Sequence, residues 1–128
     1  MVPQDSESGG ERMLTLSPET FQRMSAVEEQ RFVERIVDFL RQNVPQMAGE
    51  PQDSMVAQVR VLKAEAATYD MTSEQAVAVY ALTAALIGAD FSERFGGARK
   101  ILFSANDQDK KAQLLEGFTV TLLQKLKG

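Results

Sequence analysis

The chain has 128 residues, of which 44% are hydrophobic and 25% charged, a balance typical of one globular domain with its own apolar core. It contains neither cysteine nor histidine, which excludes disulfides, thiolate chemistry, imidazole-based catalytic triads and zinc sites with Cys or His ligands. The formal net charge of −4 argues against nucleic acid or an anionic membrane as the main partner and is compatible with a basic protein partner.

The first residues, "MVPQDSESGGERM", are rich in Ser, Gly, Pro and acidic side chains and lack the apolar run of a secretory signal. We therefore expect residues 1–12 to form a disordered N-terminal tail and residues 13–128 to form one helical domain. The same reading predicts a cytoplasmic protein.

Two helices are predicted in the first part of the domain. A short one covers 18–24, and Ser25 with Glu28 then has the spacing of a capping box that would start a second helix. This second helix is expected to run to about Asn43, because Pro45 cannot continue it. Its apolar stripe is Phe32, Ile36, Phe39 and Leu40.

A third helix is predicted from about Asp53 to Tyr69 after a connector rich in Pro and Gly. Its apolar side chains recur at steps of four and three, which is the spacing of a single buried face. These side chains are Met55, Val59, Leu62, Ala66 and Tyr69.

The fourth helix, at about 73–88, is apolar on nearly every side. Thr72 and Gln75 have capping-box spacing at its start, and Gly88 stands where a C-terminal cap is expected. The helix is shorter than the ~20 residues that a membrane-spanning helix needs, so we expect no membrane insertion. A helix of this composition must be surrounded by other helices, which makes it the predicted centre of the core.

The rest of the chain completes an all-α bundle of five to six helices around this central helix. "ADFSERFGG" is predicted to be a loop or short turn, and a short helix is expected over 98–105. A last helix, capped by Asn106 or Asp107, should run to about Lys127. No segment alternates as a strand would.

The residues suggest no catalytic, metal or cofactor site. The carboxylates fall on polar helix faces among arginines, which is typical of a solvated surface, so we expect the protein not to be an enzyme. Phe91 and Phe95 lie four apart in a polar segment; we expect one to fill the core and the other to anchor a partner. The candidate partner-binding residues are Tyr80, Asp90, Phe91 and Phe95.

Several segments together resemble a family of small helical proteins encoded beside type VI secretion effectors in bacteria. They are "FVERIVDFLRQNVP", "AATYDMTSEQAVAVYALTAALIGADF", "ARKIL" and "KKAQLL", within 16–115. The chain departs from the family pattern at Asp70, where glycine is usual, and at Ser92, where a second acid is usual. Asp70 tolerates a left-handed backbone, and Ser92 would serve as a helix cap.

The resemblance implies a non-enzymatic protein-binding accessory factor, a co-chaperone or adaptor that loads a type VI secretion effector. Its partner would be the effector's chaperone or the effector toxin itself. One alternative is an immunity protein that neutralises a cognate toxin, since an acidic surface suits a basic toxin cleft. A second alternative is a small-ligand-binding helical domain, which would need a cavity between helices.

Overall fold

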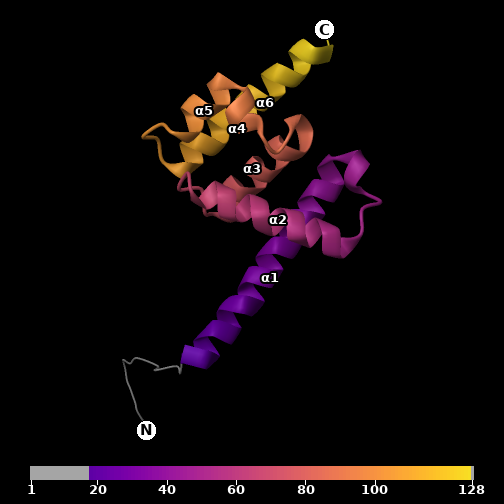
Figure 1. The fold of residues 1–128 in the computed structure, drawn as a ribbon, viewed down its shortest axis with the longest axis vertical. Helices are drawn as coiled ribbons and strands as arrows, with labels where there is room; N and C mark the ends of the chain where they lie inside the picture. The colour runs from indigo at the N-terminus through magenta and orange to yellow at the C-terminus, as the bar shows by residue number, and fades with distance from the viewer. Residues whose placement is uncertain (1–17, 128) are drawn as a thin grey trace. The chain divides into compact units, whose positions relative to one another are not determined.

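The computed structural model describes the backbone of residues 18–127 and the side chains of residues 26–126. Within this range the chain forms six α-helices and one 3₁₀ turn and contains no strand, which confirms the predicted all-α bundle (Figure 1). The predicted tail, residues 1–12, lies outside the described range. The elements are α1 (Pro18–Asn43), η1 (Pro45–Met47), α2 (Gln52–Ala67), α3 (Glu74–Ile87), α4 (Phe91–Arg94), α5 (Gly96–Leu102) and α6 (Gln108–Lys127).

The chain divides into two compact units, Met1–Arg31 and Phe32–Gly128. The described part of the first unit is the beginning of α1, where the Val27 side chain is about half exposed. The predicted break at Ser25 is wrong, because α1 is one continuous helix. The sequence around Ser25 contains neither Gly nor Pro, so nothing there stops a helix that has already begun.

The predicted central helix is confirmed in the second unit. The helix α3 packs against α2, α6 and α4, and Figure 1 shows it between α2 and α6. Half of its side chains are buried, and the others are at least partly covered except near its start. The buried ones are Ala76, Val77, Tyr80, Ala81, Thr83, Ala84 and Ile87.

Both α2 and the second half of α1 present the predicted apolar faces to this core. The α2 face follows the expected spacing, except that Tyr69 lies just beyond the helix and is only partly buried. The α1 face is set by the same periodicity. The buried members are Val33, Ile36, Val37 and Leu40 from α1, and Met55, Val59, Leu62 and Ala66 from α2.

The turn between α2 and α3 depends on two special positions. Asp70 has φ 63°, so it adopts the left-handed conformation expected where the related pattern has glycine. Ser73, not the predicted Thr72, caps α3, since its hydroxyl accepts a hydrogen bond from the Ala76 amide at 3.1 Å. At the other end of α3, Gly88 has φ 112°, a conformation that favours glycine.

The segment predicted as a loop after α3 contains the short helix α4. Ser92 lies inside this helix, so the prediction that it caps a helix is wrong. Arg94 donates to the Ile87 carbonyl at 2.9 Å and pairs with Asp90 at 3.3 Å. A long side chain from α4 therefore satisfies the end of α3, and this contact holds the turn in place.

The start of α6 holds the α2–α3 turn. The Gln108 side-chain oxygen accepts hydrogen bonds from the Thr72 and Ser73 amides at 2.7 and 2.8 Å. Lys111, only 4% exposed, donates its ammonium to the Tyr69 carbonyl at 2.7 Å. As predicted, Asp107 precedes the helix and accepts from the Lys110 amide, which fixes where α6 begins.

Buried polar groups between α3 and α6 are matched. The Thr119 hydroxyl donates to the Leu115 carbonyl at 2.8 Å, and the Thr83 and Thr119 oxygens are 3.0 Å apart. Because Thr119 has one hydroxyl hydrogen, already used on Leu115, Thr83 must be the donor of this second bond. The pair fixes one point of contact between the two helices inside an otherwise apolar interface.

We expect Gln108→Ala to lower the free energy of unfolding by about 1–3 kcal/mol, because two amide hydrogens lose their acceptor. Gln108→Glu keeps an acceptor at the N-terminus of α3 and should stay close to the wild type. The exposed Gln113→Ala on the same helix is the control. Urea unfolding followed by circular dichroism measures all three, and equal losses for Gln108→Ala and Gln113→Ala would contradict the assigned contact.

Close approach of α5 to α6 requires a glycine at one position. A Cβ atom at Gly97 would lie 2.8 Å from the ring of Phe118, whereas a Cβ at neighbouring Gly96 would meet nothing within 4 Å. The Phe118 ring also packs on Phe95, with centroids 6.0 Å apart, so it cannot move without disturbing a second contact.

Gly97→Ala should therefore destabilise the protein by about 1–3 kcal/mol relative to Gly96→Ala, which adds the same methyl group in open space. Thermal unfolding of the two variants makes the comparison. Combining Gly97→Ala with Phe118→Leu removes the ring that the methyl meets, and most of the specific loss should disappear. If both single variants melt alike, the close contact is not a constraint on the fold.

Candidate functional site

The structure separates the four predicted partner-binding residues. Tyr80 and Phe91 lie in the core, 2% and 0% exposed, with their rings 5.1 Å apart. Phe91 is thus the phenylalanine that fills the core, as one of the pair was expected to do. Phe95 is partly buried under the Arg94 guanidinium, 5.1 Å from its ring centre, and Asp90 is exposed.

These positions correct the expected anchor roles of Tyr80 and Phe91, since neither ring has surface to offer a partner in this structure. Both belong to the apolar cluster that holds α3 in place. Asp90 and Phe95 keep some exposed surface, and Arg94 contacts both of them. Their role in partner binding remains a prediction.

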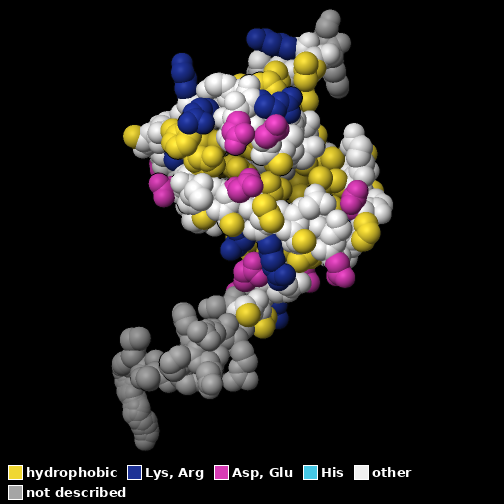
Figure 2. All heavy atoms as spheres, in the orientation of Figure 1, with side chains coloured by type: hydrophobic (Ala, Val, Ile, Leu, Met, Phe, Trp, Pro, Cys, Tyr) yellow, Lys and Arg dark blue, Asp and Glu magenta, His cyan; other side chains and the backbone are white. Residues whose placement is uncertain are grey.

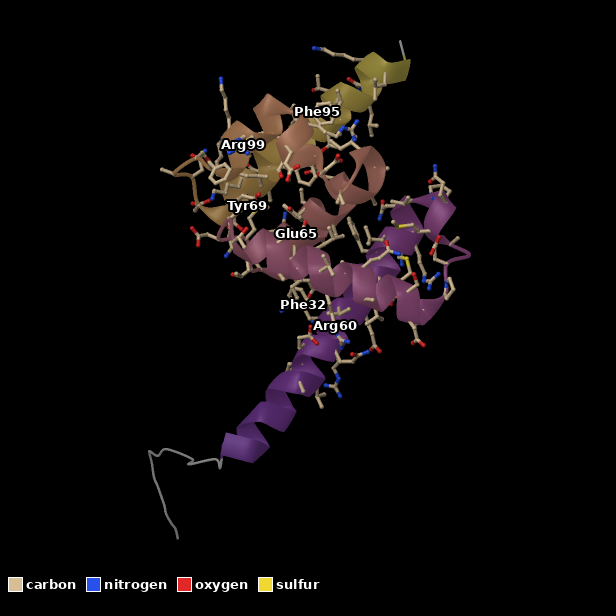
Figure 3. The ribbon with its side chains drawn as sticks, in the orientation of Figure 1. Phe32, Arg60, Glu65, Tyr69, Phe95 and Arg99 are labelled. Carbon is tan, nitrogen blue, oxygen red and sulfur yellow. The ribbon has the colours of Figure 1, made fainter. Side chains whose placement is uncertain are left out.

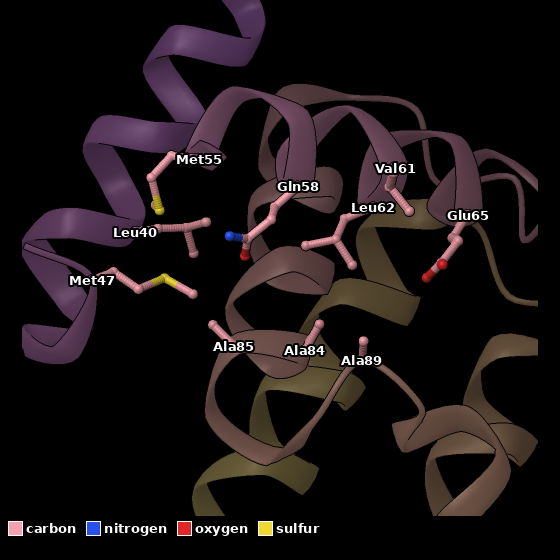
Figure 4. A pocket seen from close by; sticks show the side chains of 10 residues that line it. All are labelled: Leu40, Met47, Met55, Gln58, Val61, Leu62, Glu65, Ala84, Ala85 and Ala89. Carbon is pink, nitrogen blue, oxygen red and sulfur yellow. The ribbon is translucent and has the colours of Figure 1, made fainter. Parts of the chain in front are cut away.

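A groove of about 330 Å³ opens between α2, the C-terminal end of α3 and the α1–η1 corner of the second unit (Figure 4). Its lining is apolar except for two side chains from α2. Figure 2 shows hydrophobic side chains gathered between charged ones on one face of the molecule. The lining consists of Leu40, Met47, Met55, Gln58, Val61, Leu62, Glu65, Ala84, Ala85 and Ala89.

The groove exists because small side chains lie opposite larger ones. Ala84 and Ala85 at the end of α3, and Ala89 just after it, are too short to reach the α2 side chains across from them. Met47 and Met55 stand at one end, and their unbranched, polarizable side chains adapt to differently shaped apolar groups. Val61, 57% exposed, stands at the other end, so apolar surface faces solvent along the groove.

The single ionisable group of the lining is held by a buried phenol. The Tyr80 hydroxyl donates a hydrogen bond to Glu65 at 3.2 Å. Burial raises the pKa of Tyr80 well above its ordinary value, and the nearby Glu65 carboxylate raises it further. The phenol therefore stays protonated near neutral pH and remains a donor that orients the carboxylate.

A second hollow, of about 510 Å³, lies between α1, α3 and α6 and is closed on one side by an ion pair. Arg35 binds Glu74 through two nitrogens, with its Nη2 2.9 Å from Oε1 and its Nε 3.0 Å from each oxygen. Half of each side chain is exposed, so this pair adds little to stability. Because its one basic side chain, Arg35, is already paired with Glu74, this hollow is a weaker candidate than the groove.

An aromatic cluster lies at the edge of the bundle, at the end of α2 and α5. Tyr69 packs edge-on against Phe103 with ring centroids 5.3 Å apart, and the Arg99 guanidinium lies 5.0 Å from the Phe103 ring. Figure 3 shows Tyr69 and Arg99 at this edge. Phe103 is exposed, and Tyr69 and Arg99 both pack against its ring.

Among residues 26–126 no three carboxylates gather closely enough to hold a metal ion. No helix in the described part of the chain is both long enough and apolar enough to cross a membrane. The groove is thus the feature with the best defined binding surface.

Sequence reasoning did not identify the groove. The residues that line it come from α1, η1, α2 and the end of α3, which are far apart in the sequence. Alanines in a sequence do not indicate that an open space lies beside them. One sign was present: Val61 is apolar but lies off the buried α2 stripe, and the structure leaves it exposed.

The raised pKa of Tyr80 predicts a loss of stability at high pH. Above roughly pH 10 an unfolded tyrosine releases its proton while folded Tyr80 retains it, so the unfolded state binds fewer protons and the free energy of unfolding falls as pH rises. Tyr80→Phe should show a shallower decline over this range. Urea unfolding at several pH values measures the slopes, and parallel curves for both proteins would show that Tyr80 is not the group responsible.

Comparisons of the chain with protein-family models, curated proteins and solved structures found no match.

Proposed function

We propose that this protein is a non-enzymatic accessory factor that binds an apolar segment of another protein in the groove between α2 and α3. The observation that carries the proposal is the groove itself, an apolar channel of about 330 Å³ with exposed Val61 along it. Covering this surface with an apolar segment removes it from water, which favours association.

The lining suits a binding partner that is not folded into one rigid shape. Met47 and Met55 can repack around different apolar side chains, and the alanine floor leaves room for them. A factor that holds an effector before its export needs this tolerance. A role as co-chaperone or adaptor for a type VI secretion effector, as the resemblance implies, makes use of such a surface.

The backbone at Asp70 supports the proposed family. The related pattern has glycine at this position, and Asp70 has the positive φ of 63° for which glycine is the usual choice. The departure in sequence therefore preserves the local geometry. The same support is missing at Ser92, which lies within α4 and caps nothing.

Co-purification tests the proposal. The tagged protein, produced together with the products of its neighbouring genes, should retain either the effector or the effector's chaperone. Val61→Gln places a polar group in the groove, and Val120→Gln makes the same change at a valine on α6 that is 49% exposed and outside the groove. We expect the first to weaken retention at least tenfold and the second to leave it unchanged.

Two results would count against this function. If neither protein co-purifies, or if both variants behave alike, the groove does not bind the partner. If the protein alone protects cells that produce the toxin, it is an immunity protein, because a co-chaperone gives no such protection. Thermal unfolding of both valine variants verifies that each is folded.

A further inference from the structure

Glu65 is the one ionisable side chain in the lining of the groove, and it lies at a defined end. It comes from the last part of α2, beside Val61, whereas Met47 and Met55 lie at the opposite end (Figure 4). The carboxylate is partly buried, and it is positioned by the Tyr80 hydroxyl 3.2 Å away. A fixed negative charge thus stands next to an apolar channel.

This carboxylate has room for a second partner. An ionised carboxylate offers about four acceptor sites, and the Tyr80 phenol occupies one of them. A cation that binds a partly buried, already oriented carboxylate forms a charge-assisted hydrogen bond, which is stronger than a bond between neutral groups. The groove therefore favours an occupant that brings a positive charge to this end.

A basic side chain, Arg41, lies near the opposite end, although it does not line the groove. The Arg41 guanidinium donates to the Met47 and Ala48 carbonyls at 3.1 and 3.0 Å, which keeps its positive charge beside the Met47 end. A cation of the occupant would be repelled there and attracted at Glu65. This difference sets the direction in which a charged segment can lie.

The length of the channel suits a helix. The α2 side chains that line it run from Met55 to Glu65, which is about 15 Å at ~1.5 Å per residue. About three turns of a docked helix cover this length, with apolar anchors on one face. Gln58 lines the channel between Met55 and Val61. Its Nε2 donates to the Ser54 hydroxyl at 3.2 Å, and its side-chain oxygen can accept a hydrogen bond from the polar edge of such a helix.

We propose that the groove binds an amphipathic helix of a partner protein, one that carries a Lys or Arg at the end of its apolar face and pairs it with Glu65. The inference rests on the proposed function and specifies the partner's chemistry. A second copy of this chain is the alternative occupant, either in a reciprocal closed dimer or in a head-to-tail assembly. Light scattering after size exclusion would reveal such oligomers and would overturn the assignment.

The test uses two synthetic amphipathic helical peptides with the same Leu and Ala face. One has Lys on its polar edges, and the other has Glu. Fluorescence anisotropy with the full chain should show tighter binding of the Lys peptide. Because the protein has a net charge of −4, general attraction must be separated from contact with Glu65.

Two matched variants make that separation. Glu65→Gln and Glu116→Gln each remove one negative charge. Glu116 is on α6 and does not line the groove. The amide oxygen introduced by Glu65→Gln can still accept the hydrogen bond from Tyr80. We expect Glu65→Gln to weaken binding of the Lys peptide about tenfold more than Glu116→Gln does, and to leave the Glu peptide's binding no weaker.

Each other outcome has a defined meaning. Equal effects of the two glutamine variants, or failure of both peptides to bind the wild type, overturn the role of Glu65. If the two glutamine variants have equal effects but Val61→Gln abolishes peptide binding, the groove remains a docking site. The proposed function then stands, but the partner helix needs no Lys or Arg. If Val61→Gln and Val120→Gln leave peptide binding unchanged, the groove is not where the helix docks.

Discussion

The burial of α3 between its neighbours is the constraint on which the rest of the structure depends. This helix has almost no polar face, so water must be kept from most of its surface. Where α2 and α6 pack closely, buried alanines such as Ala76 and Ala81 allow the approach. Near its C-terminal end, Ala84 and Ala85 line a groove instead. Small side chains therefore produce both the tight core and the open channel.

A second principle concerns helix ends, which are satisfied by long polar side chains from elsewhere in the fold. Gln108 binds the amides at the start of α3, and Arg94 binds a carbonyl at its end. Arg41 does the same for the connector after α1. Polar side chains that the sequence suggests are solvated thus bind the ends of helices and turns. Glu65 differs from them because it lines the groove.

The sequence was sufficient for the helices and the core, because apolar periodicity, prolines and caps act locally. It placed the central helix correctly and anticipated the left-handed backbone at Asp70. It failed at Ser25, where a local capping pattern lies inside a longer helix, and at Ser92, which lies inside α4 instead of capping a helix. The groove depends on how helices distant in sequence pack, which no local pattern encodes.

The bonds from Gln108 to the α2–α3 turn also have a consequence for how the chain folds. They join residues 36 and 35 positions apart, so the turn lacks its acceptor until α6 has arrived. An isolated pair of α2 and α3 would expose both the apolar central helix and uncapped amides at its start. We infer that these helices assemble cooperatively with α6. During synthesis, the amides at the start of α3 therefore lack this acceptor until the start of α6 has left the ribosome.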